Sequence, residues 1–176
     1  MKLDVSPTVA AVVAEVHERA DAAAYFAAYR DTEIVVVHVV DSPRTPRVEP
    51  LDVGFAAAPH ATAFGKVMLS TLSPARRRSL LSGGLPRLTP LTLTDRQELG
   101  EELDTVRTCG VAVEAEELQR TVSCLAAPVR HPAGAVMGAI AVSVPASEFE
   151  RRRRHLEEVV RAGADRAGQA AALVAR

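Results

Sequence analysis

The chain reads VSCLAAPV at residues 122–129, HPAG at 131–134 and AVMGAIAVSV at 135–144. Two apolar runs on either side of a short turn that contains Pro and Gly predict an antiparallel hairpin. A second pair of such runs, at residues 22–30 and 34–40, is joined by a short polar link. Because the strands come in hairpins and do not alternate with crossover helices, the pattern favours an α+β fold with an antiparallel sheet over a doubly wound parallel sheet.

Helical periodicity and capping residues predict the helices around these strands. One helix covers residues 7–20, with Ser6 as its N-cap. Another runs from a capping box at Thr94–Gln97 to Gly110, which has the position of a C-terminal glycine. A second capping box, Ser147–Glu150, opens a long C-terminal helix.

The middle of the chain is less regular. The small residues at 60–69 predict a helix that packs close to a neighbour, and Ser73 opens another short helix. We expect a strand over residues 48–58 that ends before Pro59, and a short strand over 111–114.

Composition limits the class of protein. The chain has 176 residues, of which 48% are hydrophobic and 24% charged, as in a globular protein of one domain spanning residues 1–176. A net charge of −1 gives no reason to expect the whole chain to coat nucleic acid or an anionic membrane, and 3% aromatic residues exclude the stacking platforms of a single-strand binder. No apolar run reaches the ~20 residues that span a bilayer, and the N-terminal residues lack the apolar core of a signal peptide. With only two cysteines, we expect a cytoplasmic protein with reduced thiols.

Motifs for common catalytic and cofactor chemistry are missing from the sequence. Gly83–Gly84 lacks the spacing of a dinucleotide or P-loop signature, and there is no Gly-x-Ser-x-Gly nucleophile elbow. The five histidines contain no His-x-x-x-His pair, and Cys109 and Cys124 form no Cys-x-x-Cys. We therefore expect no catalytic residue, no cofactor and no metal, although a mixed zinc site built from distant residues stays open.

Three features of the sequence can each be explained by a purely structural role as well as by a functional one. The run Arg151–Arg154 could contact DNA, but acidic residues at helical spacing on both sides favour ion pairs on a solvated helix face. Glu114, Glu116 and Glu117 could do acid–base work, but such a cluster is more typical of a solvated turn. Cys124 lies within an apolar strand, so we expect it to be buried, either as a small hydrophobe or as a soft wall of a ligand cavity.

Five blocks of the chain together resemble the IclR family of bacterial transcription regulators. The first, at residues 60–69, is similar to the family's HATALGKALL. In order, the blocks are HATAFGKVML (60–69), GGLPRLTPLTLT (83–94), GVAVEAEE (110–117), SCLAAPV (123–129) and AIAVSVP (139–145). They occur in the family's order and extend over nearly the whole chain, which makes the resemblance specific.

The resemblance implies the family's C-terminal effector-binding domain, which has a GAF-like fold: a curved antiparallel sheet with helices on both sides. It also implies a small-molecule effector and a homodimer or homotetramer. The family's N-terminal winged helix–turn–helix domain is absent from residues 1–176, so we expect DNA binding only through a domain that this chain does not contain.

The family's ligand cavity lies between the sheet and the helix that follows the His-Ala-Thr block. Carried over by position, the implied ligand-binding residues are Ala63, Phe64, Glu114, Cys124, Ala141 and Ser143. Backbone N–H groups at the start of that helix favour an anionic or carbonyl group. Glu114 would accept a hydrogen bond from a ligand hydroxyl or amine, Ser143 can donate or accept, and Cys124 and Ala141 supply a small apolar wall.

Three of these positions depart from the family pattern. Phe64 replaces a residue that is usually small, Glu114 stands where Asp is more common, and Ala141 stands where Ser is common. With fewer hydroxyl groups in its lining and the ring of Phe64 in place of a small side chain, the cavity is expected to take an effector less polar than a two-carbon acid. The expected effector is a carboxylate-bearing or aromatic metabolite.

These features support a non-catalytic sensor, in which a metabolite shifts the geometry of an oligomer and so DNA binding. Two alternatives stay open. One is a GAF-like enzyme that uses a cysteine thiolate, which would need an accessible thiol of low pKa. The other is a dimerisation module without a ligand.

Overall fold

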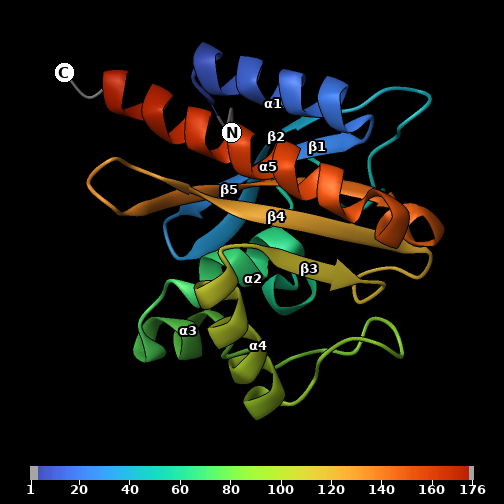
Figure 1. Ribbon diagram of the computed structural model, residues 1–176. Helices are drawn as coiled ribbons and strands as arrows, with labels where there is room; N and C mark the ends of the chain where they lie inside the picture. Colours follow the sequence, from blue (N-terminus) through green and yellow to red (C-terminus); the bar gives the residue numbers. More distant parts are fainter. Residues whose placement is uncertain (1–3, 175–176) are drawn as a thin grey trace.

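The computed structural model describes residues 4–174 and has one five-stranded antiparallel sheet, with the strand order β2-β1-β5-β4-β3. Helices α1 and α5 cover one face of the sheet, and α2, α3 and α4 lie on the other (Figure 1). The predicted α+β fold, with an antiparallel sheet between helices, is confirmed. The strands are β1 (Ala23–Arg30), β2 (Glu33–Val40), β3 (Ala112–Ala115), β4 (Val122–Arg130) and β5 (Val136–Pro145). The helices are α1 (Pro7–Ala20), the 3-10 helix η1 (Pro59–Ala61), α2 (Ala63–Ser70), α3 (Pro74–Leu80), α4 (Arg96–Cys109) and α5 (Ala146–Val174).

Alternation along the strands divides the interior into two cores. On β5, Ala139 and Ala141 face α2 and α4, whereas Ile140 and Val142 face α1 and α5. Successive side chains of a strand point to opposite faces, so one apolar run serves both cores. Alanines on the α2 side leave room for that helix to lie close to the sheet, and all eight residues of α2 are buried.

Some predicted helix ends are confirmed and others are displaced. The Ser6 side chain caps α1, and Gly110 ends α4 in the left-handed conformation. The N-cap of α4 is Asp95 and not Thr94, because the Asp95 carboxylate accepts from the N–H groups of residues 97 and 98 and its charge suits a helix N-terminus. The predicted cap Ser147 is also wrong: α5 begins at Ala146 directly after β5, and the Thr121 carbonyl accepts its first N–H.

The predicted strand over residues 48–58 is wrong. Only residues 54 and 55 pair with β2, through two hydrogen bonds to the backbone of Val36. Turns occupy the rest, since the Leu51 N–H donates to the Val48 carbonyl, and Gly54 and Ala58 have left-handed φ angles that no strand adopts. The segment is therefore a loop that lies over the edge of the sheet.

The helix predicted over residues 60–69 is broken in two. The 3-10 turn η1 ends at Ala61, Thr62 is extended, and α2 starts at Ala63 with the Thr62 hydroxyl accepting from the Gly65 N–H. This break places the N-terminus of α2 against the sheet.

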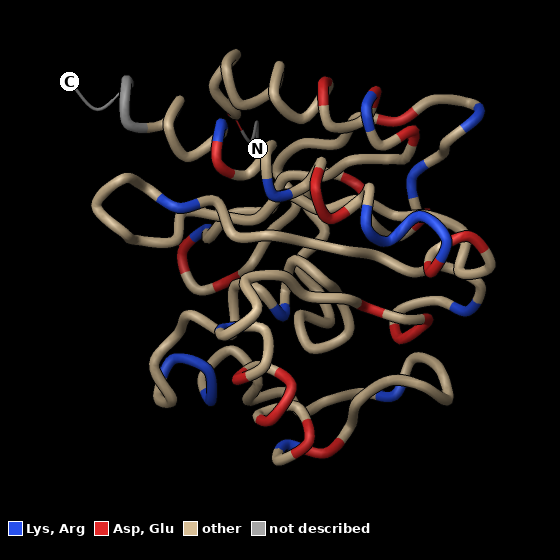
Figure 2. The backbone as a smooth tube through the Cα atoms, in the orientation of Figure 1, with Lys and Arg blue, Asp and Glu red and all other residues tan. Residues whose placement is uncertain are grey.

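The arginine run of α5 makes the ion pairs that its spacing predicts. Arg152, Arg153 and Arg154 pair with glutamates three or four residues away, and Figure 2 shows basic and acidic segments next to one another along this helix. Arg152 also donates to the carbonyl groups of Ala20 and Asp21, which ties α5 to the end of α1. None of the helices within residues 4–174 combines the length and the hydropathy of a membrane-spanning segment.

Candidate functional site

A small cavity lies between the sheet and the start of α2. We call it the inner cavity. Its walls are Tyr25, Leu51, Thr62, Ala63, Phe64, Glu114, Leu118, Cys124 and Ala141. The space is largely enclosed and too narrow for a water molecule, so any organic ligand requires the walls to move apart.

Five of the six residues predicted for the ligand site line this cavity, and the sixth, Ser143, borders it. Ser143 reaches the cavity through the hydroxyl of Tyr25, with 2.8 Å between the two oxygens. Its own side chain faces a groove on the outside of the molecule. The structure thus brings together positions that are up to 80 residues apart in the chain, and their role in binding a ligand stays a prediction.

The register of the sheet explains why these residues meet. Glu114 on β3 pairs with Cys124 on β4, and Cys124 pairs with Ser143 on β5. Directly paired residues share a face, so the three side chains form one row across the sheet. Ala141 and Tyr25 pair in the neighbouring row, between β5 and β1.

Glu114 is buried to 1% exposure. One carboxylate oxygen accepts the backbone N–H of Glu117 at 2.5 Å and that of Leu118 at 3.2 Å. Burial raises the pKa of this carboxyl to about 7, against the opposing effect of the two N–H donors. The expectation of a solvated turn is therefore wrong for Glu114 and Glu117, which are both buried, and holds only for Glu116 at the outside of the turn.

The Cys124 thiol lies beside the Glu114 carboxyl and is buried, as predicted. Burial and the neighbouring carboxylate raise the pKa of this thiol well above its ordinary value. A reactive thiolate needs the opposite shift. The geometry therefore fits a cavity wall better than a thiol enzyme.

One buried charged residue next to the cavity, Lys66, was not predicted from the sequence. Lys66 of α2 is fully buried, and its ammonium group donates to both carboxylate oxygens of Glu117 at 2.7 Å and to Glu102 of α4 at 2.6 Å. The hydroxyl of Thr92 binds the Glu117 carbonyl at 2.6 Å. This cluster holds the turn that carries Glu114, and its signal in the sequence was the single charge in the otherwise apolar block 63–69.

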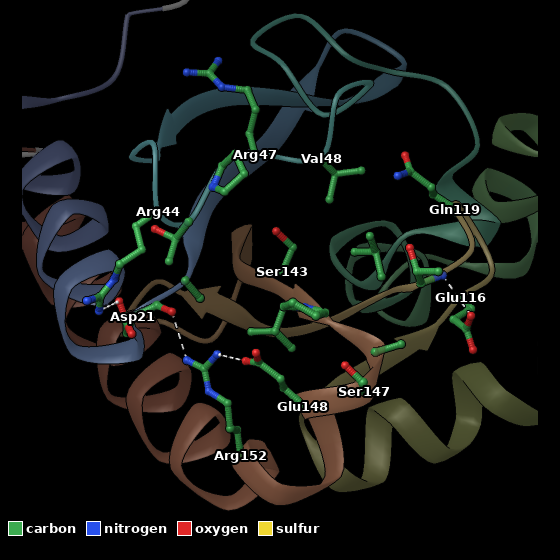
Figure 3. Close-up of a pocket in the computed structure, with 18 of the residues that line it drawn as sticks. Asp21, Arg44, Arg47, Val48, Glu116, Gln119, Ser143, Ser147, Glu148 and Arg152 are labelled. Atoms are coloured by element: carbon green, nitrogen blue, oxygen red, sulfur yellow. Dashed lines mark hydrogen bonds and ion pairs between the residues drawn. The ribbon is translucent and has the colours of Figure 1, made fainter.

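A second hollow, the outer groove, opens beside the inner cavity and has a volume of about 1000 Å³. Figure 3 shows Ser143 of β5 near its centre, with Val48 on one side and Ser147 and Glu148 on the other. Four of its charged groups pair with one another, Arg44 with Asp21 and Arg152 with Glu148. The groove is lined by residues 21–22, 44–49, 116, 119, 121–122, 143–148 and 152. Within residues 4–174, no group of three or more His, Cys, Asp or Glu side chains could hold a metal ion.

The buried Glu114 predicts a pH dependence of stability. Its pKa is near 4.5 in an unfolded chain and about 7 in the folded protein, so the folded state binds the proton more tightly between these values. The free energy of unfolding should therefore fall as the pH rises from about 4.5 to 7, and stay level above 7 with respect to this group.

Glu114→Gln should remove this pH dependence, which amounts to at most about 3 kcal/mol, because glutamine does not titrate. The glutamine side-chain oxygen still accepts from both N–H groups, so the turn should be kept. The measurement is urea unfolding of both proteins at about pH 5 and pH 7.5. Equal slopes in the two proteins would show that Glu114 does not titrate in this range.

Known proteins of similar sequence are transcriptional regulators of one family. The family model for the bacterial transcriptional regulator IclR C-terminal domain matches residues 1–168. The glycerol operon regulatory protein of Streptomyces griseus is 35% identical over 123 residues, which are 70% of this chain and 48% of that protein. The chain thus spans about half the length of such curated relatives.

Solved structures show the same arrangement. A transcriptional regulator from Rhodococcus sp. RHA1 has a TM-score of 0.87 at 27% identity, over 100% of this chain and 70% of that one. The inducer-binding domain of the PobR transcription factor from Acinetobacter, solved as a double mutant with 3-hydroxybenzoic acid, has a TM-score of 0.82 at 24% identity, over 94% and 98% of the two chains. The latter likeness is one of fold alone. Because the family model covers almost the entire chain, the resemblance is confirmed, and the chain belongs to the IclR family of bacterial transcriptional regulators through the family's C-terminal domain.

Proposed function

We propose that this domain binds a small organic effector in the inner cavity and passes the signal to a DNA-binding domain of the kind that the family carries. The observation that supports it best is the cavity itself. Its lining combines the first residues of α2, which carry backbone N–H donors, with a buried carboxyl group and apolar side chains. The relatives are named as transcriptional regulators and not as enzymes, which agrees with a sensor.

Two polar parts of the cavity lining favour different groups of a ligand. Ala63 and Phe64 are the first residues of α2, where backbone N–H groups have no partner within the helix and the helix dipole is positive. A carboxylate or carbonyl suits this part. Glu114, with its pKa of about 7, can accept from a hydroxyl or amine as the anion, or donate as the acid.

The apolar part of the lining favours a flat or aromatic body for the ligand. Leu51, Phe64 and Leu118 are the large apolar side chains of the lining, and Phe64 stands where the family usually has a smaller residue. A hydroxylated aromatic acid has all three features. The 3-hydroxybenzoic acid bound to the PobR domain is a compound of this class and is a suitable first probe.

Regulation follows if the ligand favours one conformation. The inner cavity is too narrow for a water molecule, so a ligand binds a wider state and shifts the population toward it in proportion to its preference for that state. We propose that a homodimer or homotetramer transmits this change to the DNA-binding domains.

A thermal-shift screen tests the proposal. A ligand that binds only the folded state must raise the melting temperature by mass action. We expect 3-hydroxybenzoate and related aromatic acids to raise it, and Phe64→Ala and Ser143→Ala to change or abolish that response.

The matched control is Phe149→Ala, which removes an equally buried phenylalanine from the core on the other face of the sheet. It should lower the melting temperature but keep the ligand-induced rise. Tight binding of small keto acids without binding of aromatic acids would contradict the proposed class of effector. If no acid raised the melting temperature of a folded dimer, a dimerisation module would be the better interpretation.

A further inference from the structure

A thin wall separates the inner cavity from the outer groove. Tyr25 lines the cavity, whereas Ser143 and Val48 line the groove. The Tyr25 hydroxyl joins them: it lies 2.8 Å from the Ser143 hydroxyl and accepts the Val48 backbone N–H at 2.9 Å. The two hollows would become continuous if these two hydrogen bonds opened.

The loop at residues 41–52 forms the movable side of this wall. It contains no helix or strand, and it supplies Val48 to the groove and Leu51 to the inner cavity. Arg47 braces it by pairing with Asp41 at one end and Asp52 at the other. The pair with Asp41 is bidentate, whereas the Asp52 carboxylate is 67% exposed, so that its pair contributes little to stability.

The other sides of the inner cavity are held more firmly. The helix α2 is buried along its whole length, and its Lys66 is clamped between two carboxylates. The turn behind Glu114 is fastened by that cluster and by the Thr92 hydroxyl. The loop at 41–52, by contrast, has no helix or strand and attaches to this core through the side chains of Val48 and Leu51.

We propose that the outer groove is the entrance to the inner cavity and that the Tyr25 hydroxyl is the latch that keeps the entrance shut. The use of the cavity by an effector rests on the proposed function, but opening of the latch does not require a ligand. When the loop at 41–52 moves outward, Val48 leaves Tyr25, and a molecule in the groove can pass Ser143 into the cavity.

Cys124 gives a direct readout of opening, because its thiol lines the inner cavity and is buried. The exposed Cys109 is first replaced by serine, so that only one thiol is left. The rate at which iodoacetamide modifies Cys124 in the folded protein then measures how often the cavity opens.

Tyr25→Phe removes the oxygen that carries both hydrogen bonds and keeps the ring. We expect it to raise the modification rate about tenfold or more. The matched control is Tyr29→Phe on the same strand, whose hydroxyl binds the Met68 carbonyl at 2.8 Å and touches neither the groove nor the cavity. It should change the rate by less than about twofold.

Arg47→Ala tests the route itself, because it loosens the loop without removing a cavity wall. We expect an increase of about threefold. Urea unfolding of each variant supplies the rate that global unfolding alone would give, and the measured rates should exceed it.

The proposal is overturned if Tyr25→Phe and Tyr29→Phe raise the rate equally, or if each increase equals the one that the loss of global stability predicts. An unchanged rate in Arg47→Ala would place the entrance elsewhere. Because no ligand takes part, such a failure would leave the thermal-shift test of the proposed function unaffected.

Discussion

The Gly65→Ala variant is expected to lose more than about 3 kcal/mol of unfolding free energy, or not to fold at all. A Cβ atom at residue 65 would overlap the Pro59 carbonyl oxygen and the Thr62 hydroxyl, and it would lie 2.6 Å from the Pro59 Cα. The first and last of these are backbone atoms of the turn before α2, which cannot swing aside as a flexible side chain could. The Thr62 hydroxyl also caps the helix through the Gly65 N–H, so the clash would break the start of α2.

Gly100→Ala is the matched control within a helix. A Cβ atom there would meet nothing within 4 Å apart from its chain neighbours and the backbone of its own helix, and the residue is in the interior of α4. Alanine there should stabilise the protein by about 0.5–1 kcal/mol through its higher helix propensity. Urea unfolding measures both variants, and a Gly65→Ala protein as stable as the parent would contradict the close contact between α2 and η1.

The Lys66→Met variant is expected to lose about 3–5 kcal/mol, because the buried Glu117 carboxylate would lose the ammonium group that both of its oxygens contact. Methionine has a similar length and is apolar, so the change removes the charge and leaves most of the packing. The Glu102 carboxylate is partly exposed and can be hydrated, which makes Glu117 the main source of the loss.

A double variant separates charge from packing. Adding Glu117→Gln to Lys66→Met removes the unpaired charge, and it should restore at least half of the lost stability. Arg107→Ala, which breaks an exposed pair with Asp104, should change stability by no more than about 0.5 kcal/mol. If Lys66→Met were as harmless as Arg107→Ala, the buried cluster would not stabilise the turn that carries Glu114.

Both predictions fall in the block at residues 60–69, and they show what this segment does in the fold. Gly65 lets α2 begin against η1, and Lys66 fastens the helix to the β3–β4 turn. Ala63 and Phe64 directly precede these two residues and line the inner cavity. The geometry of the candidate site therefore depends on two residues that do not themselves line it.

The strands, their hairpin pairing and most helices could be predicted from local sequence. Strand alternation, turn residues and caps such as Ser6 act over a few residues, so their pattern is visible in a single sequence. Errors arose where neighbouring signals compete. Thr94 and Asp95 are both good caps, and the apolar residues of 48–58 resemble a strand although the left-handed Gly54 and Ala58 prevent one.

The candidate site was likewise predicted only in part, because many of its contacts join residues far apart in the sequence. Its six predicted residues came from a family resemblance carried over by position, and the sheet register brings them to one place. Lys66, Tyr25 and the buried state of Glu114 were missed. Lys66 meets a carboxylate 51 residues away and Tyr25 meets a hydroxyl 118 residues away, and such contacts arise only when the packed chain brings distant segments together. Burial then alters the chemistry of the groups: the same glutamate that would be an ordinary anion in a solvated turn has a pKa of about 7 when the fold removes it from water.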